Sequence, residues 1–297
     1  MAKELFLFIS PHLDDAALSC GGLIKRLTKS GHPVLVATVF TSDLPQGLPM
    51  SWLARRNQMA WDAGMLPFAS RRDEDVNAMK TLEADHIHLG LLDAMYRMDA
   101  GNNSYYVKNT VGVPVVPIDM ENCRKLLTAK FQEIQSRYGD GVLRVFCPMG
   151  LGGHVDHMIV RNVVESFWKP DEIVYYEDYP YAGKARAIEK WNDSESTPRP
   201  WKSFVVKLTS DEISARIDSV AQYASQLRGL FPSGLERLLE IAQARLNFLA
   251  GIRFRRNYEA SYRRAESVIG QYIQNVGGEK YWLTGERQKL PDVLIQS

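Results

Sequence analysis

The chain has 297 residues and a net charge of +1, from 36 basic and 35 acidic residues. Its hydrophobic fraction of 45% and charged fraction of 24% are ordinary for a globular protein with a sizeable core. The balanced charge gives no general attraction to nucleic acid or to an anionic membrane, and no apolar run reaches the length of a transmembrane helix. We therefore expect neither nucleic-acid binding nor membrane insertion.

Three cysteines, Cys20, Cys123 and Cys147, form an odd and sparse set, which is typical of reduced thiols in a cytoplasmic protein. The apolar run at residues 5–9 is too short for the core of a signal peptide, so a cytoplasmic location is expected. Cys147 lies beside a histidine-rich motif and is a candidate metal ligand, although a buried cysteine at a strand end is the more ordinary interpretation.

Apolar runs that alternate with helical patterns predict an α/β fold, a Rossmann-like, doubly wound and mostly parallel sheet. Residues 4–9 are continuously apolar, as in a strand buried on both faces, and residues 33–40 repeat that pattern after a helix over 14–30. This βαβ unit predicts a right-handed crossover between parallel strands. Further strands are expected at 86–91, 143–148 and 172–177, and helices at 51–64, 71–84, 119–138 and 154–168.

The pattern changes after residue 190. The expected elements there are a polar loop at 191–200, a strand at 203–208, a helix that opens at the capping box 209–212 and runs toward Leu230, and a second helix at 233–251. We therefore interpret residues 1–297 as a single domain. Residues 1–190 form its α/β core, and residues 200–297 form a mainly helical C-terminal extension.

Two other segments have roles that the sequence leaves open. Residues 94–118 show no clear periodicity, and loops of this length are usually functional or mobile, so a loop that covers the substrate and a plain surface excursion are both consistent with the pattern. Residues 252–266 hold five arginines, which is typical of a solvated helix face.

A histidine and two adjacent aspartates follow the first predicted strand, in the sequence SPHLDDAALSCGG (residues 10–22). Neighbouring carboxylates repel each other, and a bound cation together with a helix N-terminus would offset that cost. Gly21 and Gly22 lack the spacing of a nucleotide-binding fingerprint, so we interpret them as positions of close helix packing.

A second motif, GLGGHVDHMIV, follows the fourth predicted strand. His154 and His157 are three residues apart at a helix start, as are His12 and Asp15, so each pair shares one helix face. In a doubly wound sheet the first and fourth strands commonly flank the point where the strand order reverses, and ligands bind there. Two histidines and one carboxylate with an open fourth position are typical of a hydrolytic zinc site. We therefore predict His12, Asp15 and His157 as metal ligands.

This ligand set leaves Asp14 free to accept a proton from water at the metal. Zn²⁺ is the predicted cofactor, although histidine and carboxylate donors also accept Fe²⁺ or another divalent ion. Either motif alone is a weak signal, because aspartates commonly cap helices and histidine pairs recur by chance. The prediction of a metal site rests on two features that the motifs share: the three-residue spacing of the side chains and the position directly after an apolar strand.

Both motifs resemble those of the PIG-L/LmbE-like family of zinc-dependent N-deacetylases, which act on N-acetylglucosamine-containing substrates and related amides. Residues 11–16 match the family's PHPDDE-type segment, and residues 154–157 match its HPDH or HVDH segment. The resemblance extends through residues 71–82, 88–97, 175–182 and 222–231. Leu13 stands where the family usually has proline and Ala16 where it often has glutamate, which suggests a branch with a different substrate.

The resemblance implies a role for each site residue. Asp14 would be the general base, His154 would stabilise the tetrahedral oxyanion or protonate the leaving amine, and Asp156 would orient a histidine. Arg71 and Asp93 match family positions near the substrate, with an exposed, ion-paired arginine as the alternative for Arg71. The implied reaction removes an N-acetyl group from a small-molecule amino sugar or sugar conjugate.

Two other functions fit the sequence less well. An amidase that cleaves a larger acyl group, such as a thiol-conjugate amide, would need a larger acyl pocket. A non-catalytic sugar- or nucleotide-binding protein is the alternative of another class, but Asp14 and Asp15 would put acidic side chains where a pyrophosphate should lie. The sequence also leaves open whether the chain forms a homo-oligomer.

Overall fold

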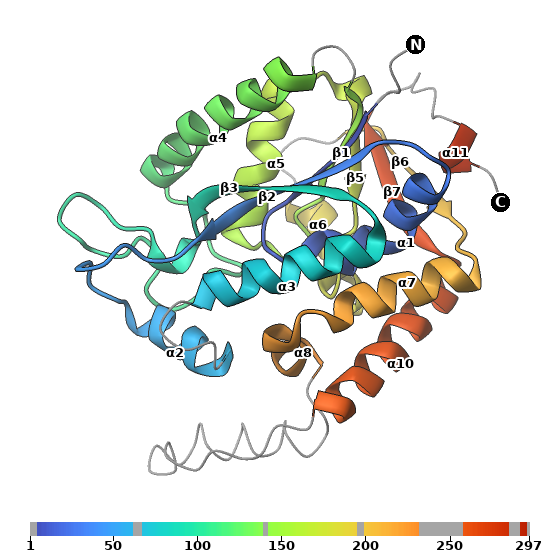
Figure 1. The fold of residues 1–297 in the computed structure, drawn as a ribbon. Helices are drawn as coiled ribbons and strands as arrows, with labels where there is room; N and C mark the ends of the chain where they lie inside the picture. Colours follow the sequence, from blue (N-terminus) through green and yellow to red (C-terminus); the bar gives the residue numbers. More distant parts are fainter. Residues whose placement is uncertain are drawn as a thin grey trace.

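The computed structural model describes residues 5–61, 67–138, 142–194, 199–231, 258–284 and 292–295. Within these residues, seven strands form one sheet in the order β3-β2-β1-β4-β5-β7-β6 (Figure 1). The strands are β1 (Leu5–Ser10), β2 (Val34–Ser42), β3 (Asp85–Leu92), β4 (Val142–Pro148), β5 (Ile173–Tyr176), β6 (Trp201–Val206) and β7 (Glu279–Thr284). Strands β1 to β5 pair in parallel, whereas β7 pairs antiparallel with both β5 and β6.

This arrangement confirms the predicted doubly wound α/β fold. The chain runs outward from β1 through β2 to β3 and then returns to β4 on the other side of β1, so the strand order reverses between β1 and β4. The described helices are α1 (Asp15–Lys29), α2 (Trp52–Trp61), α3 (Pro67–Leu82), α4 (Pro117–Tyr138), α5 (Val155–Phe167), α6 (Ala187–Ser194), α7 (Ser210–Ala221), α8 (Ala224–Leu230), α10 (Tyr258–Val276) and α11 (Asp292–Ile295), with a short 3-10 turn η1 (Ala94–Tyr96).

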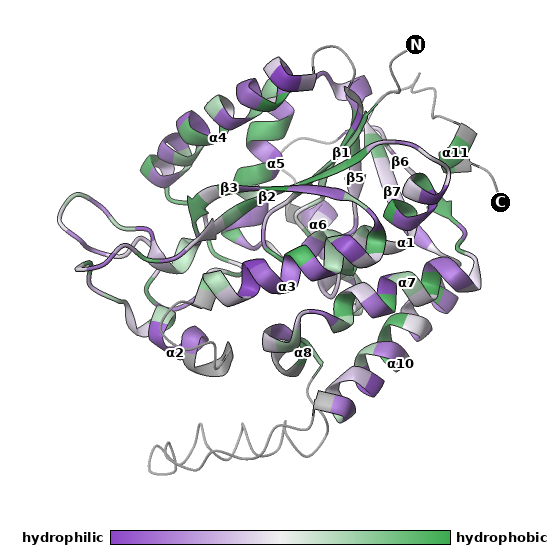
Figure 2. Cartoon of the chain, viewed as in Figure 1, coloured by the Kyte–Doolittle hydropathy of each residue, from purple (hydrophilic) through white to green (hydrophobic). Residues whose placement is uncertain are grey.

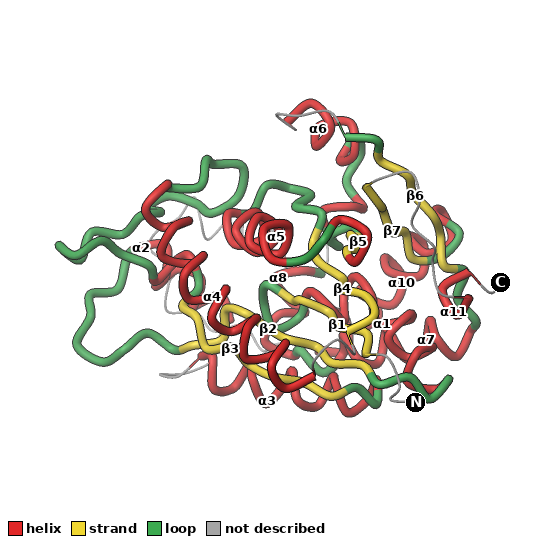
Figure 3. Tube along the Cα trace, turned by 90° about the horizontal axis from the view of Figure 1, so that it is seen from above, coloured by secondary structure: helices red, strands yellow, loops and turns green. Residues whose placement is uncertain are grey.

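Helices cover both faces of the sheet (Figures 1 and 3). Because side chains alternate along a strand, Phe6 and Phe8 of β1 join the core beneath α1, α3 and α7, whereas Leu7 and Ile9 join the core beneath α4 and α5. All six residues of β1 are buried, as the continuous apolar run predicted. Figure 2 shows the corresponding contrast between hydrophobic β1 and β2 and the mixed surfaces of α3, α7 and α10.

The segment after residue 190 differs in part from the predicted elements. Helix α6 occupies the first residues of the predicted polar loop at 191–200, and β7 had not been predicted. The capping box at Thr209 and Glu212 is confirmed, but α7 ends at Ala221 and a separate helix, α8, continues to Leu230. The predicted helix at 233–251 lies outside the described residues, as do the first arginines of the 252–266 segment, whereas Arg263 and Arg264 lie on α10.

Gly21 and Gly22 lie where α1 meets α7 and β7. A Cβ atom at Gly21 would lie 3.1 Å from the Arg216 Cα, and one at Gly22 would lie 2.5 Å from a Leu208 methyl carbon. The backbone N–H groups of Gly22 and Leu23 donate to the buried carboxylate of Glu279 at 2.8 and 2.9 Å. The interpretation of these glycines as close-packing positions is therefore confirmed.

Cys20, Cys123 and Cys147 are free thiols and all are buried. Cys147 packs among apolar side chains of the core on the α4 and α5 face, so the interpretation as a buried cysteine at a strand end is confirmed. No helix in the described part of the chain is both long and apolar enough to cross a membrane.

Candidate active site

The two sequence motifs meet at the carboxyl ends of β1 and β4. These strands are parallel neighbours, and each is followed directly by a helix, α1 after β1 and α5 after β4. His12 and Asp15 therefore lie opposite the start of α5, where His154 is the N-cap residue and His157 lies in the first turn. The topology thus brings together side chains that are about 140 positions apart in the sequence.

Asp15 lies between two imidazoles. Its Oδ2 atom is 3.2 Å from Nδ1 of His12 and 3.3 Å from Nε2 of His157. Zinc bonds of about 2.0–2.1 Å in a tetrahedral site place neighbouring ligand atoms about 3.3 Å apart. Each of these two distances on its own matches the spacing of neighbouring ligands on one metal ion, but Asp15 belongs to neither of the two described sets of three donors whose atoms all lie within 4.8 Å of one another.

Each of these imidazoles faces a buried carboxylate on its other side. His157 Nδ1 lies 2.6 Å from Oδ1 of Asp178, and His12 Nε2 lies 3.0 Å from Oδ2 of Asp156. A carboxylate that accepts the proton of one ring nitrogen leaves the lone pair of the other nitrogen available to a metal. The predicted orienting role of Asp156 thus has a specific partner, His12.

His154 lies close to the same centre but is held differently. One nitrogen each from His12, His154 and His157 lie within 4.8 Å of one another, as do single atoms of His12, Asp93 and Asp156. Both ring nitrogens of His154 already have partners, because Nδ1 accepts the backbone N–H of Asp156 at 3.2 Å and Nε2 lies 2.9 Å from Oγ1 of Thr110. His12 and His157 each face the Asp15 carboxylate with one ring nitrogen, whereas the contacts of the two His154 nitrogens are with Asp156 N and Thr110 Oγ1.

Buried carboxylates outnumber buried guanidinium groups around this centre. The carboxylates belong to Asp14, Asp15, Asp93, Asp156 and Asp178, and the guanidinium groups to Arg71 and Arg97. Although burial lowers the pKa of His157, Asp15 and Asp178 raise it to about 10. The same carboxylates favour a bound divalent cation, because it neutralises charge that water does not reach.

Asp14 is next to Asp15 in the chain, and the described contacts include no hydrogen bond or ion pair between its carboxylate and an imidazole. Burial and the negative charge of Asp15 raise its pKa to about 6, and the Arg71 guanidinium opposes that shift. Nη2 of Arg71 lies 3.7 Å from Oδ1 of Asp14, and the side chain is 3% exposed. The alternative of an exposed arginine at position 71 is therefore wrong.

Asp93 enters the site from the end of β3. Its Oδ1 atom accepts the backbone N–H of Met95 at 3.0 Å, and its Oδ2 atom lies 3.5 Å from Nε2 of His12. Burial and the charge of Asp156 raise its pKa. The structure thus places Asp93 beside the metal-binding candidates, and its predicted contact with substrate stays a prediction.

The 94–118 segment packs against the start of α5. Thr110 O accepts the backbone N–H of Val155, and the N–H of Gly112 donates to Gly153 O, both at 2.9 Å. Together with the contact between Thr110 and His154, these bonds show that the segment borders the site, and its role as a cover for the substrate stays a prediction.

The sequence interpretation missed two buried residues next to Asp156. Arg97 contacts Asp156 directly, and Asp119 contacts Arg97. Arg97 contacts Asp119 through two nitrogens at 2.7 and 2.9 Å and reaches Oδ1 of Asp156 at 2.6 Å. Tyr106 donates its hydroxyl to Asp119 at 2.8 Å. Arg97 lies inside the 88–97 segment of the family resemblance, but no local spacing links it to its partners.

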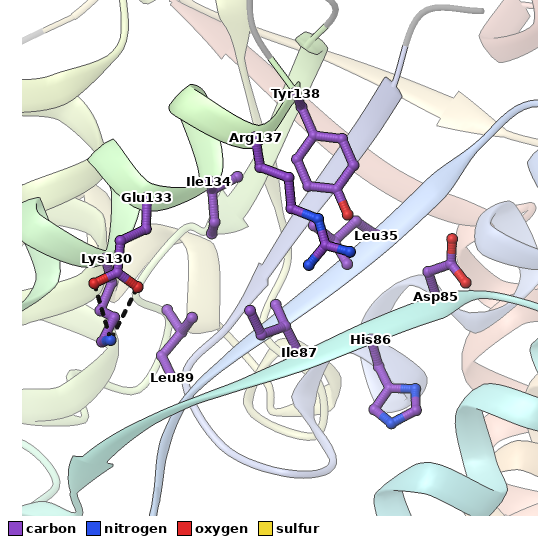
Figure 4. Close-up of a pocket in the computed structure, with 10 residues that line it drawn as sticks. All are labelled: Leu35, Asp85, His86, Ile87, Leu89, Lys130, Glu133, Ile134, Arg137 and Tyr138. Carbon is purple, nitrogen blue, oxygen red and sulfur yellow. Dashed lines mark hydrogen bonds and ion pairs between the residues drawn. The ribbon is translucent and has the colours of Figure 1, made fainter.

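A separate hollow of about 340 Å³ lies between β3 and α4 (Figure 4). Apolar side chains of both elements line it together with charged and polar groups, including His86, Lys130 and Arg137. None of the predicted site residues belongs to its lining, so it is not the site described above.

The sequence is similar to known de-N-acetylases. Residues 7–168 match the PIG-L family, described as GlcNAc-PI de-N-acetylase. A 2'-N-acetylparomamine deacetylase from Streptomyces fradiae is 30% identical over 232 residues, which cover 77% of this chain and 72% of that protein. A 2'-N-acetylparomamine deacetylase from Niallia circulans is 24% identical over 243 residues, which cover 77% of this chain and 83% of the relative.

Solved structures share the fold along most of the chain. The zinc-inhibited form of teicoplanin deacetylase Orf2 has a TM-score of 0.68 at 22% identity and covers 96% of this chain and all of its own. The A40926 pseudoaglycone deacetylase Dbv21 has a TM-score of 0.64 at 22% identity, with 96% and 98% of the two chains covered. These likenesses show that the α/β architecture recurs in other proteins.

Proposed function

Because this chain belongs to the PIG-L family of de-N-acetylases, we propose that it is a zinc-dependent hydrolase that removes the acetyl group from an N-acetylated amino sugar carried on a larger conjugate. The observation that carries this proposal is the position of Asp15 between His12 and His157, with Asp14 beside it. The names of the two relatives support the substrate class, because both act on 2'-N-acetylparomamine.

In this proposal His12, Asp15 and His157 hold the metal. Two observations support this ligand set: each Asp15–imidazole distance is close to that between neighbouring tetrahedral ligands, and a carboxylate faces the other nitrogen of each ring. A divalent metal bound there supplies Lewis-acid polarisation of the acyl carbonyl and lowers the pKa of water to about 7.

Asp14 acts as the general base. With a pKa raised to about 6 it is ionised at neutral pH yet basic enough to take the proton of the attacking water. Arg71 favours its ionised form through charge. As the tetrahedral species collapses, Asp14 returns that proton to the departing nitrogen and the C–N bond breaks. Acetic acid and the amine result, and proton transfer between them gives acetate and the ammonium form of the product.

His154 acts as a hydrogen-bond donor to the oxyanion. Its Nδ1 accepts the backbone N–H of Asp156, so the single proton of the neutral ring lies on Nε2. Burial and the nearby His12 lower its pKa to about 3, which keeps the ring neutral at physiological pH. A neutral imidazole donor can stabilise developing negative charge without giving up its proton.

The proposal is tested by amine release from a panel of N-acetylated sugars and sugar conjugates, using zinc-loaded protein with Asp14→Ala as the control. We expect release by the wild type and a rate at least about 100-fold lower for the variant, the scale of general-base catalysis. Zinc content is measured in both proteins. Release that persists in Asp14→Ala would exclude the assigned base, and tight zinc binding without release from any acetamide would favour an amidase for larger acyl groups.

A further inference from the structure

The 94–118 segment places a hydroxyl group on the imidazole that is assigned to the oxyanion. Oγ1 of Thr110 lies 2.9 Å from Nε2 of His154, and the side chains of both residues are only partly exposed. The sequence motifs do not include Thr110, and its position 44 residues before His154 gave no reason to pair the two.

The direction of this hydrogen bond follows from the other ring nitrogen. A backbone N–H is always a donor, so Nδ1 of His154, which accepts from Asp156 N, carries no proton. A neutral imidazole then carries its proton on Nε2, and that N–H donates to the Thr110 hydroxyl. The ring is thus held at both nitrogens, by Asp156 on one side and by Thr110 on the other.

The backbone holds Thr110 in a fixed position. Its carbonyl oxygen accepts the N–H of Val155, the next residue forms a bridge with His154, and Gly112 donates to Gly153. Earlier in the segment, the Tyr106 hydroxyl donates to Asp119 and accepts the N–H of Val116. The hydroxyl acceptor is therefore fixed to the same helix start that carries His154.

We propose that Thr110 is a positioning residue: by accepting the Nε2–H of His154 it holds the ring and its proton in place until the oxyanion forms and shares that proton. This inference rests on the proposed function, because it assigns the aligned N–H to deacetylation. Contacts at both ring nitrogens, with Asp156 at Nδ1 and with Thr110 at Nε2, restrain the ring before substrate arrives. When negative charge develops on the acyl oxygen, the oxyanion shares the Nε2 proton of His154. This hydrogen bond is stronger in the transition state than with bound substrate, so it lowers the activation free energy.

The test compares Thr110→Val, which keeps the shape of the side chain but lacks the hydroxyl, with Thr110→Ser, which retains it. We expect kcat to fall about tenfold in Thr110→Val with KM changed less than about twofold, a smaller loss than the roughly 100- to 1,000-fold loss of an oxyanion donor itself. Thr110→Ser should recover most of kcat. Ser104→Ala removes a hydroxyl from the same segment, where Ser104 pairs with Met98, and serves as the matched control.

A second measurement needs no substrate. In ¹⁵N-histidine-labelled protein, a proton bound to Nε2 of His154 should be visible in the wild type and in Thr110→Ser, with His154→Asn used to assign it, and should broaden or disappear in Thr110→Val. If Thr110→Val retains both this resonance and full kcat, the proposal is wrong, and a rise in kcat would show that Thr110 restrains His154 instead. A wild type without deacetylase activity would contradict the proposed function, while the resonance would still decide whether Thr110 orients the ring.

Discussion

Arg97 reaches Oδ1 of Asp156 at 2.6 Å, while the other carboxylate oxygen of Asp156 faces His12 at 3.0 Å. One buried carboxylate therefore connects a guanidinium group to a proposed metal ligand. On its far side Arg97 is bound by Asp119, so a single cation balances two buried carboxylates. Although burial raises the pKa of Asp156, the charges of Arg97 and His12 lower it overall, which keeps Asp156 ionised as an acceptor.

Arg97→Met should destabilise the protein by about 3–5 kcal/mol, because it leaves Asp119 and Asp156 buried without their counter-charge. The free energy of unfolding from urea titration at pH 7 measures this loss. Adding Asp119→Asn should recover part of it, since the amide oxygen can still accept the Tyr106 hydroxyl and one uncompensated charge is gone. A loss below about 1 kcal/mol in Arg97→Met would show that the ion pairs contribute little.

Asp178→Asn should weaken zinc binding by about 10- to 100-fold. The amide would present an N–H group to Nδ1 of His157, or leave that nitrogen without its carboxylate, and either change favours the tautomer whose Nε2 carries a proton. Chelator competition measures the zinc Kd. Glu177→Gln is the matched control, because Glu177 is an adjacent buried carboxylate that bonds Tyr272 and Trp282 instead. Equal losses in both variants would contradict the orienting role of Asp178.

The pH dependence of kcat/KM should report Asp14 on its acid side. The base works only when deprotonated, so activity rises with pH through the pKa of Asp14, which is about 6 before the charge of a metal is added. A cation beside Asp14 lowers that pKa, so half-maximal kcat/KM is expected at or below about pH 6. An acid limb that is centred well above pH 6 would assign the base to another group.

Arg71 lowers the pKa of Asp14, so its removal should have the opposite effect on the acid limb. Arg71→Gln should move the limb to higher pH, whereas Arg71→Lys, which keeps the positive charge, should leave it closer to the wild-type position. The kcat/KM profiles of the three proteins provide the measurement. An unchanged limb in Arg71→Gln, combined with a raised KM, would instead favour the predicted role of Arg71 in substrate binding.

The candidate ligands could be predicted from the sequence because they lie in two short motifs directly after apolar strands. His12 and Asp15 share one helix start and His157 another, so the strand order alone brings them together. Asp178 and Arg97 were beyond that argument. Their contacts depend on the paths of the loops that follow β5 and β3, and no periodicity in the sequence records which residue a loop turns toward the site.

The fold likewise has elements that the sequence predicts and elements that it does not. Buried parallel strands such as β1 can be recognised by their continuous apolar residues, and a helix follows each of β1, β2, β3 and β4 in the chain. Strand β7 has only alternate residues buried and pairs antiparallel with β5 after a long excursion through α7 and α10. These six residues come directly after a helical pattern, and a charged residue, Glu279, occupies one of the buried positions, so the sequence interpretation placed no strand there.

Gly22→Ala should destabilise the protein by about 1–3 kcal/mol, the usual cost of overpacking a close contact. The new methyl group would lie 2.5 Å from a Leu208 carbon and 3.0 Å from Oε1 of Glu279, which also accepts the Gly22 N–H. Thermal and urea unfolding measure the change, with the zinc Kd measured alongside. Because Gly22 lies two turns along α1 from Asp15, the Kd should stay within about twofold of the wild type.

Gly270→Ala, at a helical glycine of α10 with nothing within 4 Å of an added Cβ, should be neutral or stabilising. A loss of zinc binding in Gly22→Ala without a loss of stability would show that this helix contact is part of the site after all.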